Sequence, residues 1–199
     1  MEINSLLQRN SFFIKEHLGM FKLSNNYDVY DSNRKEIILN CREQKASQLT
    51  KLFRFDKSTK IFTPFNLKIT TSLGSSLLSV KKDWHFLYAK VSVFDEKDKL
   101  IGYFKQQNIG NGRFSGIQFN AYDIEDKFLF KFKGLYNFKL VNDQEDLGSI
   151  VKEFTNEAKA IFTSADDYVL EINDTVSKND FSRYFLLAAV FCIDMVLHE

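Results

Sequence analysis

The chain has 199 residues, of which 44% are hydrophobic and 27% charged, and its formal net charge is +1. This composition is that of a globular protein that can bury a core without disulfides or metals, and the near-neutral charge argues against a general nucleic-acid binder. The aromatic content is biased, because 21 Phe and 8 Tyr stand against one Trp and one Pro, and Phe and Tyr favour strands and large apolar cores. We expect one domain over residues 1–199.

The N-terminal residues and the cysteines bear on the cellular compartment. An early acid, Glu2, and the lack of a continuous apolar run speak against a secretory signal, and position 2 lacks the glycine that myristoylation needs. Cys41 and Cys192 lie far apart and form no CxxC pair, which indicates a reducing compartment. We therefore expect a cytoplasmic protein.

Pairs of alternating apolar and polar runs, separated by acidic or polar turns, follow one another through most of the chain. They predict five hairpins, over residues 27–39, 66–80, 90–104, 116–132 and 136–151. The alternation indicates one buried and one wet face per hairpin, and closure of such a meander into a barrel removes its exposed edges.

The C-terminal segment is apolar on every face from Tyr184 to Leu197, with Asp194 as the exception. Fourteen helical residues rise about 21 Å, short of the roughly 30 Å hydrocarbon core of a bilayer, so a helix buried in protein is expected. Ser177 and Asp180 have capping-box spacing and place the helix at about 180–198. We predict a mainly β fold, a closed antiparallel β-barrel of about 10–12 strands around this helix, which plugs the lumen.

Asp194 is a costly residue for a buried helix unless it is paired or lies at the rim. We expect it near a barrel mouth, where it accepts hydrogen bonds from strand ends. The alternative places it on a polar track for lipid head groups, should the helix enter a membrane.

Two C-terminal stretches carry a family resemblance. Residues 162–172, FTSADDYVLEI, resemble the acidic strand before the last helix of phospholipid scramblases, and residues 187–195, LAAVFCIDM, resemble that family's terminal helix with its Ile-Asp pair. The hairpin cadence is similar to the tubby-like barrel to which scramblases are assigned. The resemblance spans about residues 11–199. It implies a scramblase-related protein that binds anionic membrane phospholipids peripherally, at the inner face of the membrane, with phospholipid scrambling as a further implied activity.

The resemblance also implies a calcium response, with Asp166 and Asp167 as candidate metal ligands. Calcium takes six to eight oxygen ligands, and adjacent carboxylates on a strand point to opposite faces. Ser164 stands where the family pattern has its first acid. No other cofactor is expected.

Basic residues near aromatic ones are the candidates for binding lipid head groups. Lys81 and Lys82 precede Trp84, the only Trp of the chain and a residue suited to the membrane–water interface. Lys105 lies near the end of a predicted strand, and Lys131 and Lys133 share one face of another. Each lysine near an anionic surface contributes about 1 kcal/mol. Alternating lysines also serve as ordinary solvation on outer strand faces, so the pattern alone leaves both interpretations open.

No pattern of catalytic residues stands out. His17, His85 and His198 are scattered without metal-like spacing, and no G-x-S-x-G, P-loop or HExxH motif is present, so an enzyme is not expected and no catalytic residue is assigned. The alternative to lipid binding is a soluble protein-interaction scaffold with a protein partner and no lipid activity, which would tolerate Lys→Glu changes at the candidate lysines. Nucleic acid is a disfavoured partner because of the near-neutral charge.

Overall fold

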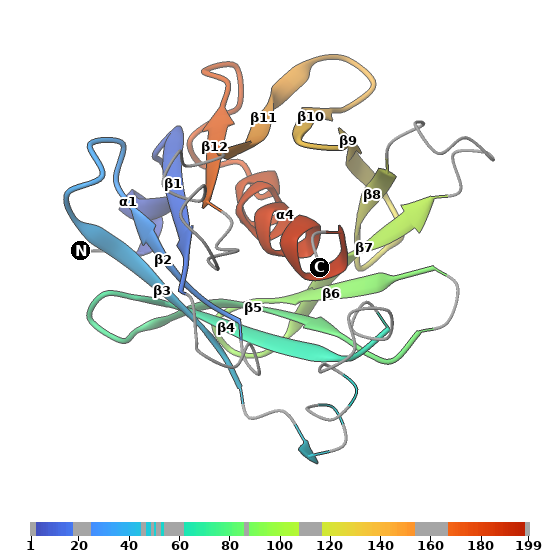
Figure 1. The fold of residues 1–199 in the computed structure, drawn as a ribbon. Coiled ribbons are helices and arrows are strands. Elements are labelled where there is room, and N and C mark those ends of the chain that lie inside the picture. The colour runs from blue at the N-terminus through green and yellow to red at the C-terminus, as the bar shows by residue number, and fades with distance from the viewer. Residues whose placement is uncertain are drawn as a thin grey trace.

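A closed antiparallel barrel surrounds a hydrophobic helix in the computed structural model of the chain (Figure 1). The structure describes residues 3–17, 25–44, 47, 48, 50, 53, 62–85, 88–107, 117–153 and 167–197. Within these residues twelve strands form the barrel, and helix α4, Ser182–Leu197, lies inside it. The predicted fold class is therefore confirmed.

The barrel is a meander in which strands adjacent in sequence pair with each other, and β1 pairs with β12 to close it. A short helix, α1 (Ile3–Leu7), precedes the first strand. The strands are β1 (Ser11–Glu16), β2 (Asn26–Tyr30), β3 (Ile37–Glu43), β4 (Phe65–Thr71), β5 (Ser76–Lys82), β6 (Lys90–Phe94), β7 (Leu100–Gln107), β8 (Ile117–Asp123), β9 (Phe128–Gly134), β10 (Asn137–Val141), β11 (Asp146–Glu153) and β12 (Asp167–Ile172). The five predicted hairpins are β2–β3, β4–β5, β6–β7, β8–β9 and β10–β11.

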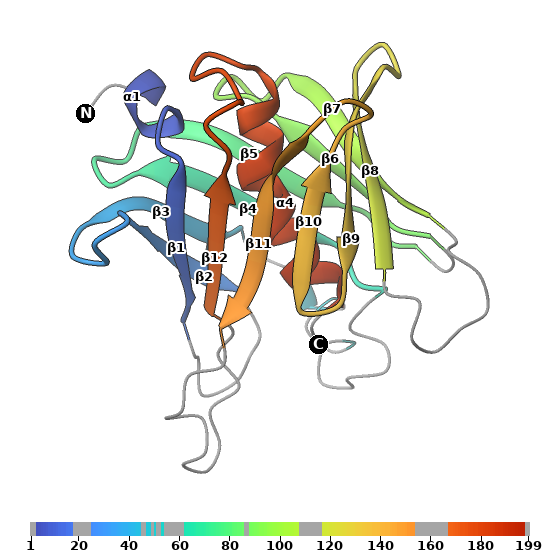
Figure 2. The same ribbon diagram turned by 90° about the horizontal axis from the view of Figure 1, so that it is seen from above.

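The two ends of the barrel differ. We call one the hairpin end, because it holds the short turns 31–36, 72–75, 95–99, 124–127 and 142–145 and the first residues of α4. We call the other the opposite end, because it holds the last residues of α4 and residues 83–85, 88, 89, 135 and 136 between strands. Figure 2 shows α4 running along the barrel from the hairpin end toward the C-terminus.

The core forms between the inner face of the barrel and every face of α4. Phe185 and Phe191 of the helix are fully buried, and the ring of Phe185 meets Phe104 of β7 at a centroid distance of 5.9 Å. Gly102 makes this approach possible, since a Cβ there would lie 2.2 Å from the backbone oxygen of Tyr122 and 2.7 Å from Phe185 Cζ. The segment that is apolar all round is thus surrounded by protein.

The start of α4 is fixed by Asp180 and Arg183. The helix begins at Ser182, two residues later than expected, and Asp180 Oδ1 accepts a hydrogen bond from the Ser182 N–H at 2.7 Å. Arg183 is 1% exposed and donates to the carbonyl oxygens of Leu7 and Val176, among others. Sequence reasoning missed Arg183, because most of its partners lie far away along the chain.

The other end of α4 is fixed by Asp194, which is 4% exposed. Its Oδ1 accepts a hydrogen bond from the Tyr168 hydroxyl at 2.6 Å, and its Oδ2 accepts one from the Tyr27 hydroxyl. Both tyrosines are the second residues of their strands, β2 and β12. Asp194 therefore accepts hydrogen bonds near strand ends as expected, although side chains rather than backbone groups donate them.

Candidate functional site

Three of the candidate lysines lie together on the outer surface of the barrel. Lys105 on β7 and Lys131 on β9 both stand opposite Asn120 of the intervening strand β8, and Lys133 stands opposite Gln118 of the same strand. Neighbouring strands are about 4.8 Å apart, so two strand spacings, about 10 Å, separate the backbones that carry Lys105 and Lys131. The structure thus brings these three predicted residues onto one patch.

Two further lysines that sequence reasoning missed extend this patch. Lys90 of β6 stands directly opposite Lys105, and Lys139 of β10 stands directly opposite Lys133. We call Lys90, Lys105, Lys131, Lys133 and Lys139 the lysine face. In the register of the described strands no acidic residue stands opposite any of the five.

The two directly opposed lysine pairs lower the stability of the folded barrel. Like charges directly across an antiparallel pair are destabilising, so outer-face solvation by itself does not favour Lys90 opposite Lys105 or Lys133 opposite Lys139. A cation–π contact of Lys90 offsets part of this repulsion, because its Nζ lies 3.9 Å from the centroid of the Tyr103 ring. A basic surface of this kind fits an external anionic partner.

The lysines near Trp84 do not join the lysine face. Successive residues of a strand point to opposite sides, and accordingly Lys81 points outward from β5 and Lys82 points inward. Lys81 Nζ lies 3.5 Å from Asp98 Oδ1 and 4.2 Å from the centroid of the Phe94 ring. Lys82 is only 2% exposed, and its Nζ lies 5.6 Å from the centroid of the Phe65 ring. Lys82 therefore does not lie on the outer surface of the barrel, and the part that the six candidate residues play in binding head groups stays a prediction.

Lys81, Lys82 and Trp84 meet instead at a pocket of about 340 Å³ at the opposite end of the barrel. Its wall is formed by the end of β3, the start of β4 and the end of β5. The charged and aromatic residues that line it are Glu43, Phe65, Lys81, Lys82, Asp83 and Trp84.

His85 follows the pocket residues in sequence, and its pKa reflects the burial and the charges around it. Partial burial and the nearby charge of Lys82 lower the pKa of His85 to about 4. The imidazole is therefore neutral at pH 7, and the positive charge at this end of β5 comes from the lysines.

Exposed aromatic side chains gather at the same end. Trp84 is 41% exposed, Tyr88 51% and Tyr136 49%, and they lie in the β5–β6 and β9–β10 connections. Trp84 also makes an edge-to-face contact with Phe53, with 5.4 Å between ring centroids. Trp and Tyr are the residues that favour membrane–water interfaces.

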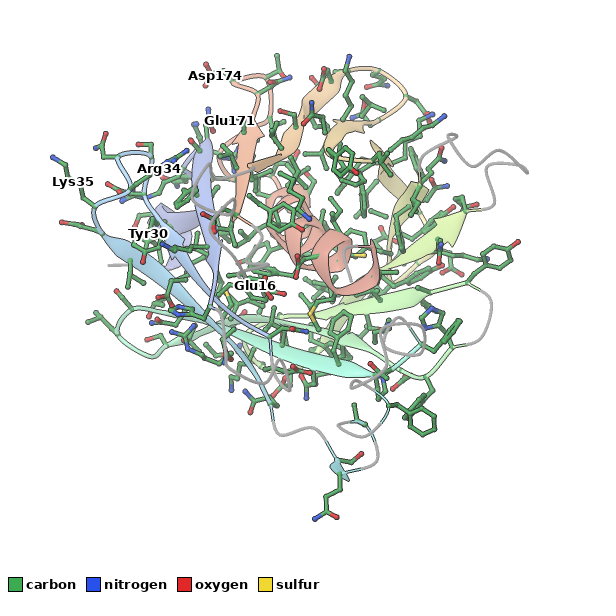
Figure 3. The ribbon with its side chains drawn as sticks, viewed as in Figure 1. Glu16, Tyr30, Arg34, Lys35, Glu171 and Asp174 are labelled. Carbon is green, nitrogen blue, oxygen red and sulfur yellow. The ribbon has the colours of Figure 1, made fainter. Side chains whose placement is uncertain are left out.

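The hairpin end has the opposite charge. Its five turns hold nine acidic and five basic residues. One of the basic residues, Lys35, points away from the barrel in Figure 3, as does Asp174 in the connection between β12 and α4. The barrel is therefore acidic at one end and basic on the outer face of β6–β10.

The calcium prediction rests on Asp166 and Asp167. Asp166 lies outside the described residues, and Asp167, the first residue of β12, is 6% exposed and stands opposite Lys15. The part of the chain that the structure describes contains no group of three or more His, Cys, Asp or Glu residues able to hold a metal ion. Calcium binding stays a prediction.

In the described residues the fold is a closed twelve-stranded antiparallel barrel with a buried terminal helix and a basic outer face. A family model described as Scramblase matches residues 2–199, and the chain belongs to the scramblase family, which is not an enzyme family. No curated protein and no solved structure matches the chain. Among the helices within the described residues, none combines the length and the apolar character needed to cross a membrane.

Proposed function

We propose that the protein binds anionic phospholipid membranes peripherally, at their inner face, through the lysine face. The observation that carries the proposal is the pair of directly opposed lysines, Lys90 with Lys105 and Lys133 with Lys139, which cost stability in isolation. An anionic surface relieves this repulsion. Family membership supports phospholipid as the partner.

The expected strength follows from the number of lysines. Five lysines at about 1 kcal/mol each give about 5 kcal/mol, which corresponds to reversible binding in the submillimolar range. The exposed rings of Trp84, Tyr88 and Tyr136 at the adjacent end add apolar contact with the interface.

Charge also sets the expected orientation. An anionic surface repels the acidic hairpin end, and it attracts the outer face of β6–β10. The hairpin end therefore faces away from the membrane, and residues 83–85, 88, 89, 135 and 136 at the opposite end lie close to the head groups.

Phospholipid scrambling is the second candidate function, and family membership favours it. Scrambling needs a polar path for head groups across about 30 Å of hydrocarbon, and the 16 residues of α4 rise only about 24 Å. Peripheral binding is therefore the activity that the geometry supports best. A leaflet-exchange assay with a fluorescent phospholipid in reconstituted vesicles tests the second activity separately.

Flotation of the purified protein with vesicles tests the binding proposal. We expect binding to vesicles that contain an anionic phospholipid, no binding to purely neutral vesicles, and weaker binding at higher salt. Calcium dependence of the same binding tests Asp166 and Asp167 as ligands. Failure to bind under all these conditions would favour the protein-scaffold alternative.

A further inference from the structure

A pocket of about 490 Å³ lies at the hairpin end of the barrel, beside the start of α4. Its walls are the first residues of β9 and β11, the β10–β11 turn and the connection between β12 and α4. We call it the hairpin-end pocket. Its volume falls within the usual range of ligand sites, and it shares no lining residue with the lysine face. Membrane binding through the lysine face therefore makes no use of this pocket.

The inner part of the hairpin-end pocket is apolar. Leu147 and Val176 are only 4% and 3% exposed, and Phe128 and Leu129 are half-buried. The pocket thus offers an apolar floor to a side chain that enters it.

Exposed apolar side chains continue this surface beyond the pocket. Phe181 lies between two lining residues in sequence and is 45% exposed, although its ring packs on Phe185 of α4 at a centroid distance of 5.5 Å. Ile124 is 57% exposed and follows Asp123, whose Cα lies beside Gly102, as Phe185 does. Single exposed apolar residues are ordinary, but several of them around an apolar pocket indicate an interaction surface.

The rim of the pocket is acidic. Asp143, Glu145 and Asp180 contribute three carboxylates to its lining, and the described lining residues include one cation, Lys127. The β10–β11 turn does not depend on the first two carboxylates, because the Asn142 side chain accepts, at 2.8 Å each, the two backbone N–H groups that fix the turn. Asp143 and Glu145 are exposed, and their charge complements a basic partner.

An arginine or lysine side chain of a second protein matches both the floor and the rim. Its methylene stem can pack on Leu147 and Val176 while its cationic head reaches the carboxylates of Asp143 and Glu145. Apolar residues beside this cation in the partner would cover Phe181. A small organic cation would leave the Phe181 ring exposed, which favours a protein segment as the occupant.

We infer that the hairpin-end pocket is the docking site for a basic amphipathic segment of another protein, anchored by an arginine or lysine side chain. This inference goes beyond membrane binding, and the hairpin end faces away from the membrane in the proposed orientation. The barrel can then hold a membrane on its lysine face and a protein partner at the hairpin end at the same time.

Fluorescence anisotropy with a labelled model peptide tests the inference without lipid, so its outcome is independent of membrane binding. The probe is LRRLLRRLLRRL, which places leucine and arginine on opposite faces of a helix. One comparison peptide has serine in place of leucine, and the other has glutamate in place of arginine. We expect saturable binding of the probe, at least about tenfold weaker binding of the serine peptide, and no binding of the glutamate peptide. Equal affinity for the serine peptide, or no saturable binding of the probe, would overturn the inference.

Charge-removing variants locate the binding. Asp143→Asn with Glu145→Gln keeps the hydrogen bonds that fix the turn, and we expect it to weaken probe binding at least about tenfold. The matched control, Asp31→Asn with Glu36→Gln, removes the same charge from the β2–β3 turn at the same end, and the new amide oxygen can still accept the Lys35 N–H. The control should change the affinity by no more than about twofold. Equal losses for the two variants would overturn the pocket as the docking site.

Ile124→Ser tests the apolar part of the surface. Because this side chain is 57% exposed, its replacement should leave the fold intact, and we expect at least about threefold weaker binding of the probe. Leu73→Ser is the matched control, since Leu73 is 79% exposed in another turn of the hairpin end. Undiminished binding by the Ile124 variant would contradict an apolar contact at this surface.

Discussion

The hydrogen bonds to Asp194 predict a specific cost for Tyr168→Phe. The substitution removes the hydroxyl that donates to Asp194 Oδ1 at 2.6 Å and leaves a buried acceptor short of one partner. Loss of one partner at a buried polar group costs about 1–3 kcal/mol. For a urea m-value of about 2 kcal/mol/M, the unfolding midpoint should fall by about 0.5–1.5 M.

Tyr103→Phe is the matched control for this prediction. Tyr103 also donates its hydroxyl to a carboxylate, Asp126 Oδ1 at 2.7 Å, but this hydrogen bond is exposed to solvent. Its loss should change the free energy of unfolding by no more than about 0.5 kcal/mol. If urea unfolding gives equal costs for the two substitutions, Asp194 does not anchor α4 in the way described.

Three further predictions concern the core and the pocket. Cys41 and Cys192 are buried, and burial raises the pKa of both thiols well above the ordinary value, so they should react with a disulfide reagent at pH 8 only when the protein unfolds. The pKa of His85 is lowered to about 4, so the folded protein binds a proton at this imidazole more weakly than the unfolded chain does. The neutral imidazole therefore contributes stability above pH 6.5, and this contribution is lost as the pH falls toward 4. Nuclear magnetic resonance should find a titration midpoint near pH 4 for His85, and a midpoint near 6.5 would contradict the described environment. Gly102→Ala should destabilise the barrel by about 3 kcal/mol in urea unfolding, because the added methyl group overlaps both the strand and the helix, and a cost below about 1 kcal/mol would contradict this packing.

The architecture could be predicted well from the sequence, because the alternation of each strand and the apolar character of the terminal helix are local patterns. Strand β4 alternates strictly, because Phe65, Leu67 and Ile69 are buried and the residues between them are half-buried. This period of two can be recognised in the sequence. The same period placed Lys82 on the inner side together with Leu78 and Val80, so its burial could have been found from the sequence.

The lysine face could not be predicted in full, because it depends on strand register. Lys90 and Lys139 become neighbours of Lys105 and Lys133 only through pairing between strands. One of these two strand pairs, β6–β7, has a register shift, between Val93 and Phe94, and such an irregularity leaves no clear mark in the sequence. Arg183 was missed for a related reason, since its acceptors come from residues 7–10 and 176.

Charge reversal on the lysine face tests the proposed membrane binding most directly. The variant Lys105→Glu, Lys131→Glu, Lys133→Glu is compared with a control that makes the same change in net charge at the hairpin end. The control is Lys35→Glu, Lys97→Glu, Lys99→Glu, three exposed turn residues.

Flotation with vesicles that contain an anionic phospholipid is the measurement. Loss of three lysine contacts at about 1 kcal/mol each predicts at least about hundredfold weaker binding for the lysine-face variant. The control should lose much less, because its charges face away from the membrane. Equal losses for the two variants, or undiminished binding of the lysine-face variant, would contradict the proposal that this face binds the membrane.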